Sequence, residues 1–226
     1  TEIYTLSLHD ALRSLGKMEI LWLIAIGVIA YLIGSVSSAI IVGRIFGGED
    51  IRTKGSGNAG ATNALRTYGK KAAAIVTVCD CLKAVAAILI AMLISNMTGI
   101  DSVYGNTPVY VAGVCAVLGH NFPIYFGFHG GKGILVSMVA MLFANWWIGL
   151  IVLVFALIVM AVSKYVSLGS ILGSVLLVIL SLIFGGGDIA YILFCVILAV
   201  LAVFMHRANI KRLINGTENK LGSKKG

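Results

Sequence analysis

Residues 119–133 read Gly-His-Asn-Phe-Pro-Ile-Tyr-Phe-Gly-Phe-His-Gly-Gly-Lys-Gly, and the rest of the chain is organised around them. This stretch interrupts a mostly apolar sequence with two histidines, a lysine and five glycines. Glycine lets a backbone turn sharply and approach a ligand closely. Successive backbone N–H groups form an anion-binding concavity, to which a lysine adds a full charge. We therefore predict that the stretch forms the floor of a phosphate site.

The composition around this stretch is that of a membrane protein. Of 226 residues, 59% are hydrophobic and 12% are charged, with a mean hydropathy of +1.02. A soluble domain carries about 25% charged residues. Several apolar blocks approach or exceed the roughly 20 residues that a helix needs to cross a bilayer. We predict an all-α, polytopic membrane protein with a single transmembrane domain over residues 18–226.

Residues 1–17 are mixed and polar. They lack the basic segment before an apolar core that marks a secretory signal peptide. We expect them to be a non-native or upstream extension, and a short amphipathic surface helix is the alternative. The four cysteines lie inside apolar blocks without the spacing of metal ligands, so we expect no disulfide, no structural metal and no cofactor.

Apolar blocks alternate with polar loops along the chain. We expect spans at residues 20–45, 72–94, 109–125, 165–184 and 189–205. Residues 133–163 would form a helix of about 46 Å, which is long for one span. Trp146 and Trp147 lie near the middle of this segment, and tryptophan favours the membrane interface. We therefore predict two short spans that meet at the tryptophans, and seven spans in total.

Basic residues test this count. With seven spans, residues 44–71, Lys132, Lys164 and the basic tail from residue 206 onward fall on one side of the membrane. The loops around Asp101, Trp146 and Asp188 carry no lysine or arginine. Short loops rich in lysine and arginine stay in the cytoplasm. We predict an external N-terminus and a cytoplasmic C-terminus. The net charge of +8 therefore reflects loop placement and not a nucleic-acid partner.

Polar residues from four distant segments converge on the cytoplasmic face. Arginine binds phosphate as a two-pronged fork and lysine binds it as a point charge, while serine hydroxyls and backbone N–H groups are neutral donors. Such a set suits anionic phosphate oxygens. Its members are Ser56, Asn58, Asn63 and Arg66, then Lys132 with Gly130, Gly131 and Gly133, then Ser167 and Ser170, and finally His206, Arg207 and Asn209.

Several of these residues have structural interpretations. Basic residues at an inner face commonly set topology and anchor helices in lipid, and we prefer this interpretation for Arg52. His120, close to Pro123, could be only a helix-end cap. Asp80 and Lys83 are three apart and share one helix face. They mark either a functional site within the membrane or a neutralising pair that holds the bundle together.

Missing motifs narrow the chemistry. The positions five after His120, His129 and His206 are not aspartate, so the His-x4-Asp base that is usual in glycerolipid acyltransferases is absent. Lys132 is followed by glycine, where a nucleotide-binding phosphate loop needs serine or threonine. No cluster of carboxylate, histidine and cysteine residues suggests a metal site. These absences disfavour nucleotide and metal chemistry.

Five segments, in order, resemble the bacterial acyl-phosphate:glycerol-3-phosphate acyltransferases, the PlsY family. They are residues 55–66 (Gly-Ser-Gly-Asn-Ala-Gly-Ala-Thr-Asn-Ala-Leu-Arg), Asp80-x-x-Lys83, residues 119–133, residues 165–170 (Tyr-Val-Ser-Leu-Gly-Ser) and residues 206–218. The resemblance spans residues 18–218 and implies seven transmembrane helices in the bacterial inner membrane. It also implies transfer of an acyl group from acyl phosphate to the 1-hydroxyl of glycerol 3-phosphate, giving lysophosphatidic acid and phosphate at the cytoplasmic face.

The resemblance also implies residue roles. Catalytic contacts fall to Ser56, Arg66, Lys132, His206 and Asn209, and substrate contacts fall to Ser167, Ser170 and the backbone N–H groups of Gly130, Gly131 and Gly133. Asn58, Asn63 and His120 would shape the loops around the substrates. The hydroxyl proton would pass either to His206 or to a phosphate oxygen of the substrate. The partners implied are the two substrates and membrane lipid, with a functional link to the enzyme that produces acyl phosphate.

Two other classes of protein remain alternatives. A transporter or channel for organic phosphates would use the same donors, although the sequence shows no inverted repeat or broken midplane helix. A catalytically inactive relative that only binds another enzyme of the pathway is the second alternative. Formation of lysophosphatidic acid by the purified protein separates both from an acyltransferase.

Overall fold

The computed structural model describes residues 8–221, and its regular secondary structure is entirely helical over that range. The expectation that residues 1–17 are an extension concerns their origin and stays a prediction; residues 1–7 lie outside the described part. From Leu8, the chain is helical and continuous with the first apolar block. The helices are α1 (Leu8–Gly34), α2 (Ser38–Gly47), α3 (Ala61–Thr98), α4 (Asp101–Tyr104), α5 (Thr107–Asn121), α6 (Ile134–Ala144), α7 (Trp146–Ser163), α8 (Val166–Phe184), α9 (Ile189–Met205) and α10 (Arg207–Ile214), with 3-10 turns η1 (Ile51–Thr53) and η2 (Ile124–Phe126).

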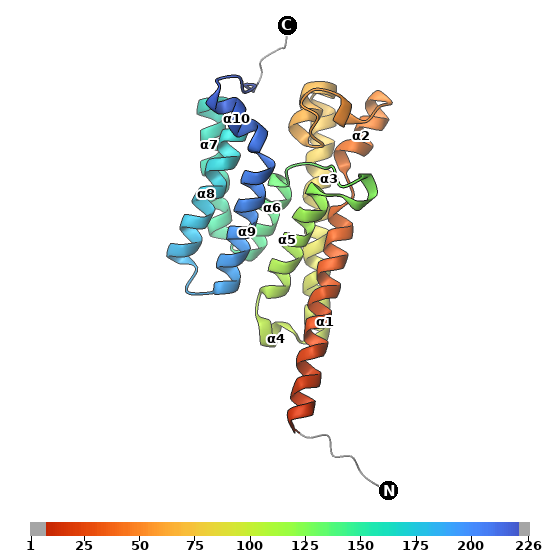
Figure 1. Cartoon of the computed structure of the whole chain (residues 1–226), viewed down its shortest axis with the longest axis vertical. Coiled ribbons are helices and arrows are strands. Elements are labelled where there is room, and N and C mark those ends of the chain that lie inside the picture. Colours follow the sequence, from red (N-terminus) through yellow and green to blue (C-terminus); the bar gives the residue numbers. More distant parts are fainter. Residues whose placement is uncertain (1–7, 222–226) are drawn as a thin grey trace.

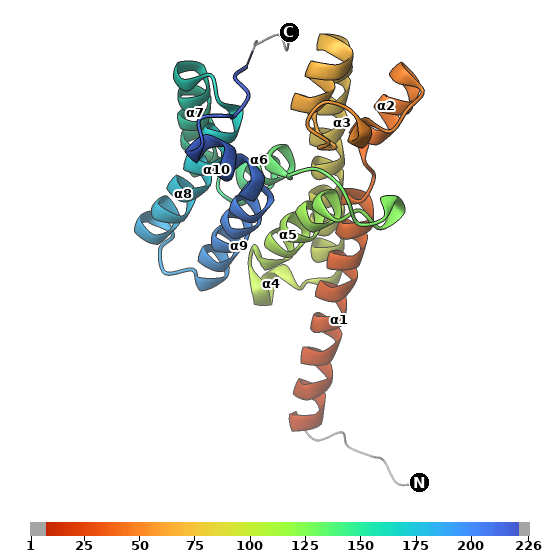
Figure 2. The ribbon, with the colours of Figure 1, turned by 45° about the horizontal axis from the view of Figure 1, so that its top comes forward.

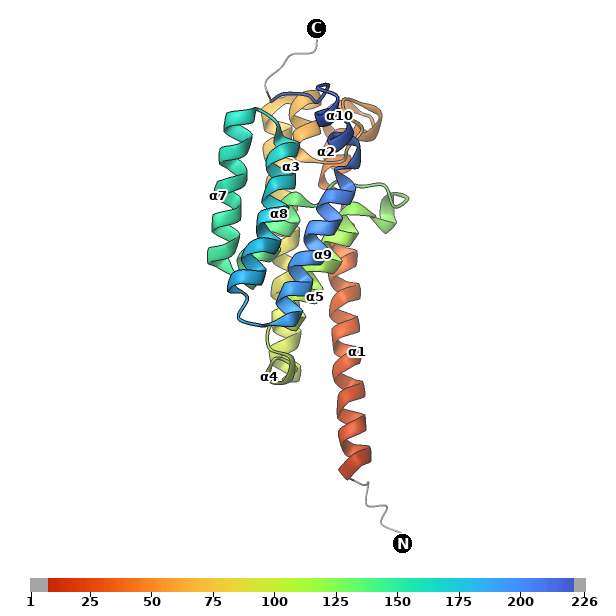
Figure 3. The ribbon, with the colours of Figure 1, turned by 60° about the vertical axis from the view of Figure 1, so that its left-hand side comes forward.

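Two groups of helices make up the bundle (Figure 1). Helices α1, α2, α3 and α5 pack together on one side, and α7, α8 and α9 pack together on the other. The short helix α6 contacts members of both groups and lies between them in Figure 2. Figure 3 shows that the N-terminal end of α1 extends beyond the other helices.

Glycines bring α1 and α5 into backbone contact. A Cβ atom on Gly34 would lie 2.2 Å from the carbonyl oxygen of Ala116, and one on Gly119 would lie 2.2 Å from that of Tyr31. Small residues in membrane helices allow such close packing. The glycine at position 34 therefore marks a close contact between these two helices.

Of three predicted helix boundaries, two differ from the structure and one is confirmed. The expected span at residues 20–45 is broken after Gly34, and α2 begins only at Ser38. The expected loop at residues 47–71 ends early, because α3 begins at Ala61 and bends at Gly69, whose φ is 84°. The predicted division of residues 133–163 is confirmed: α7 begins after Asn145, whose side chain accepts a hydrogen bond from the N–H of Ile148 at 3.3 Å.

The helix lengths are those of a multi-pass membrane protein. Among the described residues, five helical segments are long and apolar enough to cross a membrane, at residues 16–47, 61–98, 107–126, 146–163 and 166–184. Helix α9 forms a sixth candidate together with α10, to which it is bent by 60°. Helix α6 has 11 residues and is about 16 Å long, shorter than the roughly 30 Å of hydrocarbon.

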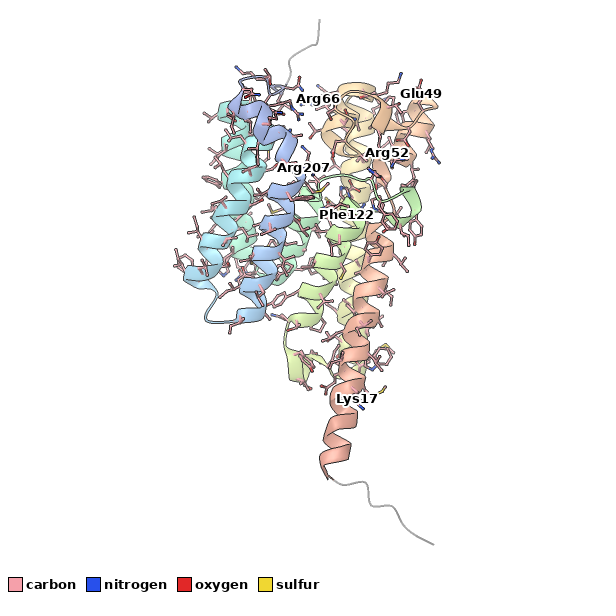
Figure 4. The ribbon with its side chains drawn as sticks, in the orientation of Figure 1. Lys17, Glu49, Arg52, Arg66, Phe122 and Arg207 are labelled. Carbon is pink, nitrogen blue, oxygen red and sulfur yellow. The ribbon has the colours of Figure 1, made fainter. Side chains whose placement is uncertain are left out.

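The connections that carry the predicted site residues gather at one end of the bundle. We call this the loop end, and it comprises residues 48–60, residues 122–133 and α10. In Figure 4, Arg52, Arg66, Phe122 and Arg207 lie toward this end, and Lys17 lies toward the opposite end. The loop end therefore combines segments that are far apart in the sequence.

Candidate anion-binding site at the loop end

The glycine-lysine loop, residues 130–133, lies directly on the C-terminal turn of α5. The N–H groups of Gly130 and Gly131 donate to the carbonyl oxygens of Asn121 at 3.0 Å and His120 at 3.1 Å. A Cβ atom on Gly131 would lie 2.1 Å from His120 Nε2 and 2.5 Å from the carbonyl oxygen of Ala59. Only glycine fits here, because backbone and a buried ring occupy the space of a side chain.

This packing changes the role expected of the glycines. We predicted that Gly130, Gly131 and Gly133 present N–H groups to a ligand, but the first two donate within the chain. Gly133 has a φ of 74° and leads into α6 at Ile134. The first N–H groups of a helix have no partner inside it and favour an anion. The donors available to a phosphate therefore lie at the start of α6, beside Lys132.

Lys132 is connected to the C-terminal segment by a chain of hydrogen bonds. Its Nζ donates to Asn209 Oδ1, and Asn209 Nδ2 donates to Glu218 Oε1 at 2.9 Å. Glu218 Oε2 accepts from Arg212 Nε at 2.8 Å. The predicted convergence of Lys132 and Asn209 is confirmed. Glu218 ends the fifth segment of the resemblance but was assigned no role, and it orients Asn209 from the far side.

Burial lowers the pKa of Lys132 to about 8, with Glu218 opposing this shift and Arg212 and Arg66 adding to it. Two arginines therefore lie within electrostatic reach of the ammonium group. Arg66 is exposed on α3, and Figure 4 shows it and Arg207 on the two helix groups at the same end of the bundle. This concentration of positive charge favours a ligand with more than one negative charge.

His206 occupies the bend between α9 and α10. It is 3% exposed, and its Nδ1 lies 2.7 Å from the carbonyl oxygen of Ala202. A carbonyl oxygen can only accept, so Nδ1 carries a proton. In the neutral ring Nε2 is then an acceptor. His206 also lies within electrostatic reach of Lys132, so a base and a cation share the site.

The first loop of the site is shaped by Asn63. Its Oδ1 accepts from the N–H of Ser56 at 2.9 Å, and its Nδ2 donates to the carbonyl oxygens of Ile51 and Lys54 at 3.2 and 3.0 Å. The prediction that Asn63 shapes this loop is confirmed. Asn58 is half-buried with its amide nitrogen against Gly60, while the Ser56 side chain is exposed.

Ser167 and Ser170 lie on α8. Both are buried, and the Ser170 hydroxyl donates to the carbonyl oxygen of Val166 at 3.0 Å. Ser167 Oγ has no hydrogen-bond partner among the described residues. Ser170 lines a pocket between α6, α7, α8 and α9 whose other walls are mostly apolar, with Ile134, Ser137, Met138, Met141, Val152, Ala156, Gly173, Ser174, Leu177, Leu198 and Ala202.

Arg52 is a structural residue that the sequence interpretation missed. Its Nη1 donates to the carbonyl oxygens of Phe126 at 2.7 Å and His129 at 2.8 Å, and Asp50 holds the rest of the guanidinium. The guanidinium of Arg52 binds protein groups and ties the first loop to the second, so the lipid-anchor part of our interpretation was wrong. Its role in setting topology stays a prediction. The acidic residue two positions earlier was the available signal.

The predicted pairing of Asp80 and Lys83 is confirmed, with Lys83 Nζ 2.9 Å from Asp80 Oδ1. The pair continues to His120, whose Nδ1 lies 2.9 Å from the same Nζ. His120 is buried beneath the glycine-lysine loop, so it is more than a cap on α5. Across the described residues, no group of three or more histidine, cysteine or carboxylate side chains is arranged to hold a metal ion.

Fold and site together define a multi-pass helical membrane protein with a concentration of positive charge at one end of its bundle. A sequence model of the family described as "Glycerol-3-phosphate acyltransferase" matches residues 24–216. The chain belongs to the glycerol-3-phosphate acyltransferase family.

Individual relatives agree with this family. The glycerol-3-phosphate acyltransferase of Clostridioides difficile (strain 630) is 45% identical over 208 residues, covering 92% of this chain and 100% of the relative. That of Thermoanaerobacter sp. (strain X514) is 48% identical over 197 residues, covering 87% and 94%. The crystal structure of PlsY (YgiH), an integral membrane glycerol 3-phosphate acyltransferase in its glycerol 3-phosphate form, matches with a TM-score of 0.78 at 32% identity, covering 88% and 96%. Its lysophosphatidic acid form matches with a TM-score of 0.75 at 30% identity, covering 88% and 95%.

Proposed function

We propose that this protein transfers an acyl group from an acyl phosphate to the 1-hydroxyl of glycerol 3-phosphate, producing lysophosphatidic acid and phosphate. The observation that carries the proposal is the position of Lys132. It lies at the start of α6, bound to Asn209 and within reach of Arg66, and α6 also lines the apolar pocket. The family, and the glycerol 3-phosphate and lysophosphatidic acid forms of the matching PlsY structures, support the same reaction.

The two phosphate groups need separate partners. Lys132 and the N–H groups at the start of α6 would hold the phosphate of the acyl donor. Arg66 and Ser56, both exposed at the loop end, would hold glycerol 3-phosphate, because a guanidinium binds phosphate through two parallel hydrogen bonds. This division allows a water-soluble acceptor to meet a membrane-embedded donor.

In the reaction, the oxygen of the 1-hydroxyl attacks the carbonyl carbon of the acyl phosphate. A new C–O bond forms, the bond from that carbon to the phosphate oxygen breaks, and phosphate leaves with the electron pair. The hydroxyl proton passes to His206 Nε2 or to a phosphate oxygen of a substrate. N–H groups at the start of α6 stabilise the oxyanion, a role worth about 3 kcal/mol for a well-placed donor.

The apolar pocket beside Ser170 would receive the acyl chain. Ser174 lines it one helical turn below Ser170, and Val175 on the same helix is 46% exposed. We expect Ser174→Phe to shorten the acyl chain that is accepted, because the ring fills the pocket. Val175→Phe is the matched control and should leave the preference unchanged. Turnover of acyl phosphates of graded length measures both, and an unchanged preference in Ser174→Phe contradicts this placement of the chain.

For the topology, we infer seven spans in a bacterial inner membrane, with the N-terminus outside and the loop end in the cytoplasm. The absence of lysine and arginine from the loops around Asp101, Trp146 and Asp188 supports this orientation. Cysteine accessibility at Ser56 and Asn145 in intact cells and in opened vesicles tests it. Supply of acyl phosphate by a partner enzyme also belongs to this proposal.

The decisive experiment supplies purified protein in lipid with palmitoyl phosphate and labelled glycerol 3-phosphate. We expect labelled lysophosphatidic acid and an equal amount of released phosphate. Well-folded protein that forms no product overturns the acyltransferase proposal, and uptake of glycerol 3-phosphate into sealed vesicles would then favour the transporter. Acyl-CoA or acyl-carrier protein that serves equally well as direct donor overturns the assignment of acyl phosphate.

A further inference from the structure

A buried polar cluster lies beneath the glycine-lysine loop and takes no direct part in the proposed chemistry. Asp80 and Lys83 project from α3, Ser38 from α2 and His120 from α5, and each is at most 8% exposed. Charged groups inside a membrane bundle are costly and tend to be functional. The cluster therefore needs an explanation beyond holding three helices together.

The ammonium of Lys83 has three hydrogens and three acceptors within reach. Its Nζ lies 2.9 Å from Asp80 Oδ1, 2.8 Å from the carbonyl oxygen of Val36 and 2.9 Å from His120 Nδ1. Ser38 Oγ donates to Asp80 Oδ1 at 3.0 Å and so holds the carboxylate in place. The carbonyl of Val36 is exposed by the break between α1 and α2.

This geometry determines where His120 carries its proton. Asp80 Oδ1 lies 2.9 Å from Lys83 Nζ but 3.7 Å from His120 Nδ1, so the carboxylate favours the charge on Lys83. Lysine is also intrinsically a stronger base than histidine by about four orders of magnitude. An ammonium can only donate, so His120 Nδ1 accepts and the ring proton lies on Nε2. Nε2 faces the glycine-lysine loop, since a Cβ atom on Gly131 would lie 2.1 Å from it and 2.5 Å from the carbonyl oxygen of Ala59.

We propose that Lys83, held by Asp80, is a positioning residue that fixes His120 as the Nε2–H tautomer beneath the glycine-lysine loop. The ring of His120 then presents its Nε2–H donor, and not a lone pair, to the junction of the first and second loops. A lone pair there would repel an anionic substrate, whereas the N–H dipole attracts it. The inference rests on the proposed function for its kinetic consequence, but the tautomer itself can be measured without activity.

The first test is the tautomer of the wild-type protein. Histidine labelled with 15N gives different two-bond correlations for Nδ1–H, Nε2–H and the doubly protonated ring. The chain has four histidines, and the spectrum of His120→Gln identifies the signal of His120. We expect the Nε2–H pattern. An Nδ1–H or doubly protonated ring in wild type overturns the proposal whatever the variants do.

The second test removes the pair without leaving a lone buried charge, which single substitutions would do at high cost in stability. In Asp80→Asn/Lys83→Met we expect His120 to show a mixture of tautomers. We also expect the KM for palmitoyl phosphate to rise about tenfold, as when the partner that orients a functional histidine is lost. The KM for glycerol 3-phosphate should stay unchanged. A folded double variant with a wild-type tautomer and KM overturns the proposal.

Two further variants separate positioning from general stabilisation. Glutamine at position 120 has an amide N–H near the place of Nε2 but no tautomers, so adding Asp80→Asn/Lys83→Met to His120→Gln should raise the KM no further. An equal rise in both backgrounds contradicts action through His120. Tyr110→Phe is the matched control: it removes a 3.2 Å hydrogen bond to Asp188 at the other end of the bundle and should change neither readout. Wild-type protein without product would instead be a failure of the proposed function.

Discussion

Glycines gather at both ends of the bundle, in residues 130–133 of the loop end and residues 185–187 of the opposite end. At the opposite end, Gly186 and Gly187 have φ values of 62° and 78°, and no atom lies near the position of a Cβ. At the loop end, Gly130 is pressed against the backbone of α5, and Gly131 is pressed against the ring of His120 and the carbonyl oxygen of Ala59. Glycine at one end allows a turn, and at the other it allows close contact between three segments.

Polar side chains differ between the ends in the same way. At the opposite end, Asn145 and Asp188 cap the helices that follow them, at 3.3 Å from Ile148 N and 3.0 Å from Tyr191 N. At the loop end, the bonds of Arg52 to Phe126 and His129 and of Lys132 to Asn209 join distant parts of the chain. Turn chemistry dominates one end and tertiary assembly of a site dominates the other.

The largest expected effect separates the two kinds of glycine. Gly131→Ala should lower kcat/KM by about 100-fold, because its Cβ must displace His120 or the backbone at Ala59, and catalysis is that sensitive to a shift of about 1 Å. Gly187→Ala should cost roughly 1–2 kcal/mol of stability from its left-handed backbone but keep activity. Kinetics and thermal unfolding in detergent measure both. Equal losses of activity would mean that the glycines at both ends are only structural.

Removal of the Arg66 side chain should have the second-largest effect on the kinetics. Arg66→Ala should raise the KM for glycerol 3-phosphate by roughly 100-fold with a smaller change in kcat, because a charge-assisted bidentate contact is lost. Lys71→Ala, which removes an exposed charge from the same helix, is the control and should behave as wild type. An unchanged KM in Arg66→Ala would exclude its proposed contact with the acceptor phosphate.

Arg52 tests whether joining two loops matters more than capping one helix. Arg52→Ala should lower kcat/KM by about tenfold, because it frees the second loop from the first and loosens the positioning of the site. Asn145→Ala should cost about 1 kcal/mol of stability as a lost N-cap and leave kcat/KM intact. If Arg52→Ala affects only stability, the two ends do not differ in the way proposed.

Local patterns predicted much of the opposite end and less of the loop end. The break at Asn145 and the helix over residues 189–205 follow from residue types near each other in sequence, and both are confirmed. The break at Ser35 was missed, because the group that stabilises it lies on another helix. Lys83 of α3 donates a hydrogen bond to the carbonyl oxygen of Val36, which the break exposes. The pattern of apolar residues along one helix does not predict a hydrogen bond that another helix donates.

In the candidate site too, residue types were predictable from the sequence, whereas contacts made by distant segments were not. The donors were recognisable from their types, and the link from Lys132 to Asn209 confirms that two distant segments converge. Arg52 resembled any basic residue in a polar loop, because its partners are backbone carbonyls of another segment and leave no mark in the sequence. The N–H groups of Gly130 and Gly131 were assigned to a ligand for a similar reason: their acceptors, at Asn121 and His120, belong to the end of a helix whose direction the sequence does not specify.

The smallest effect concerns pH and distinguishes the buried Lys132 from exposed basic residues. Because the pKa of Lys132 is about 8, its charge is present below that pH and is lost as the pH rises through it. The KM for acyl phosphate should therefore increase about twofold between pH 7 and pH 8. Phosphate monoesters have a second pKa near 6, so glycerol 3-phosphate keeps its charge over this range.

In Lys132→Arg, whose guanidinium stays protonated, the KM for acyl phosphate should not change with pH, even if the altered contact with Asn209 raises its absolute value. Lys71→Ala should retain the wild-type profile. A wild-type KM that does not change with pH, or an equal slope in Lys132→Arg, would place the titrating group elsewhere and remove the electrostatic distinction between Lys132 and the surface charges around it.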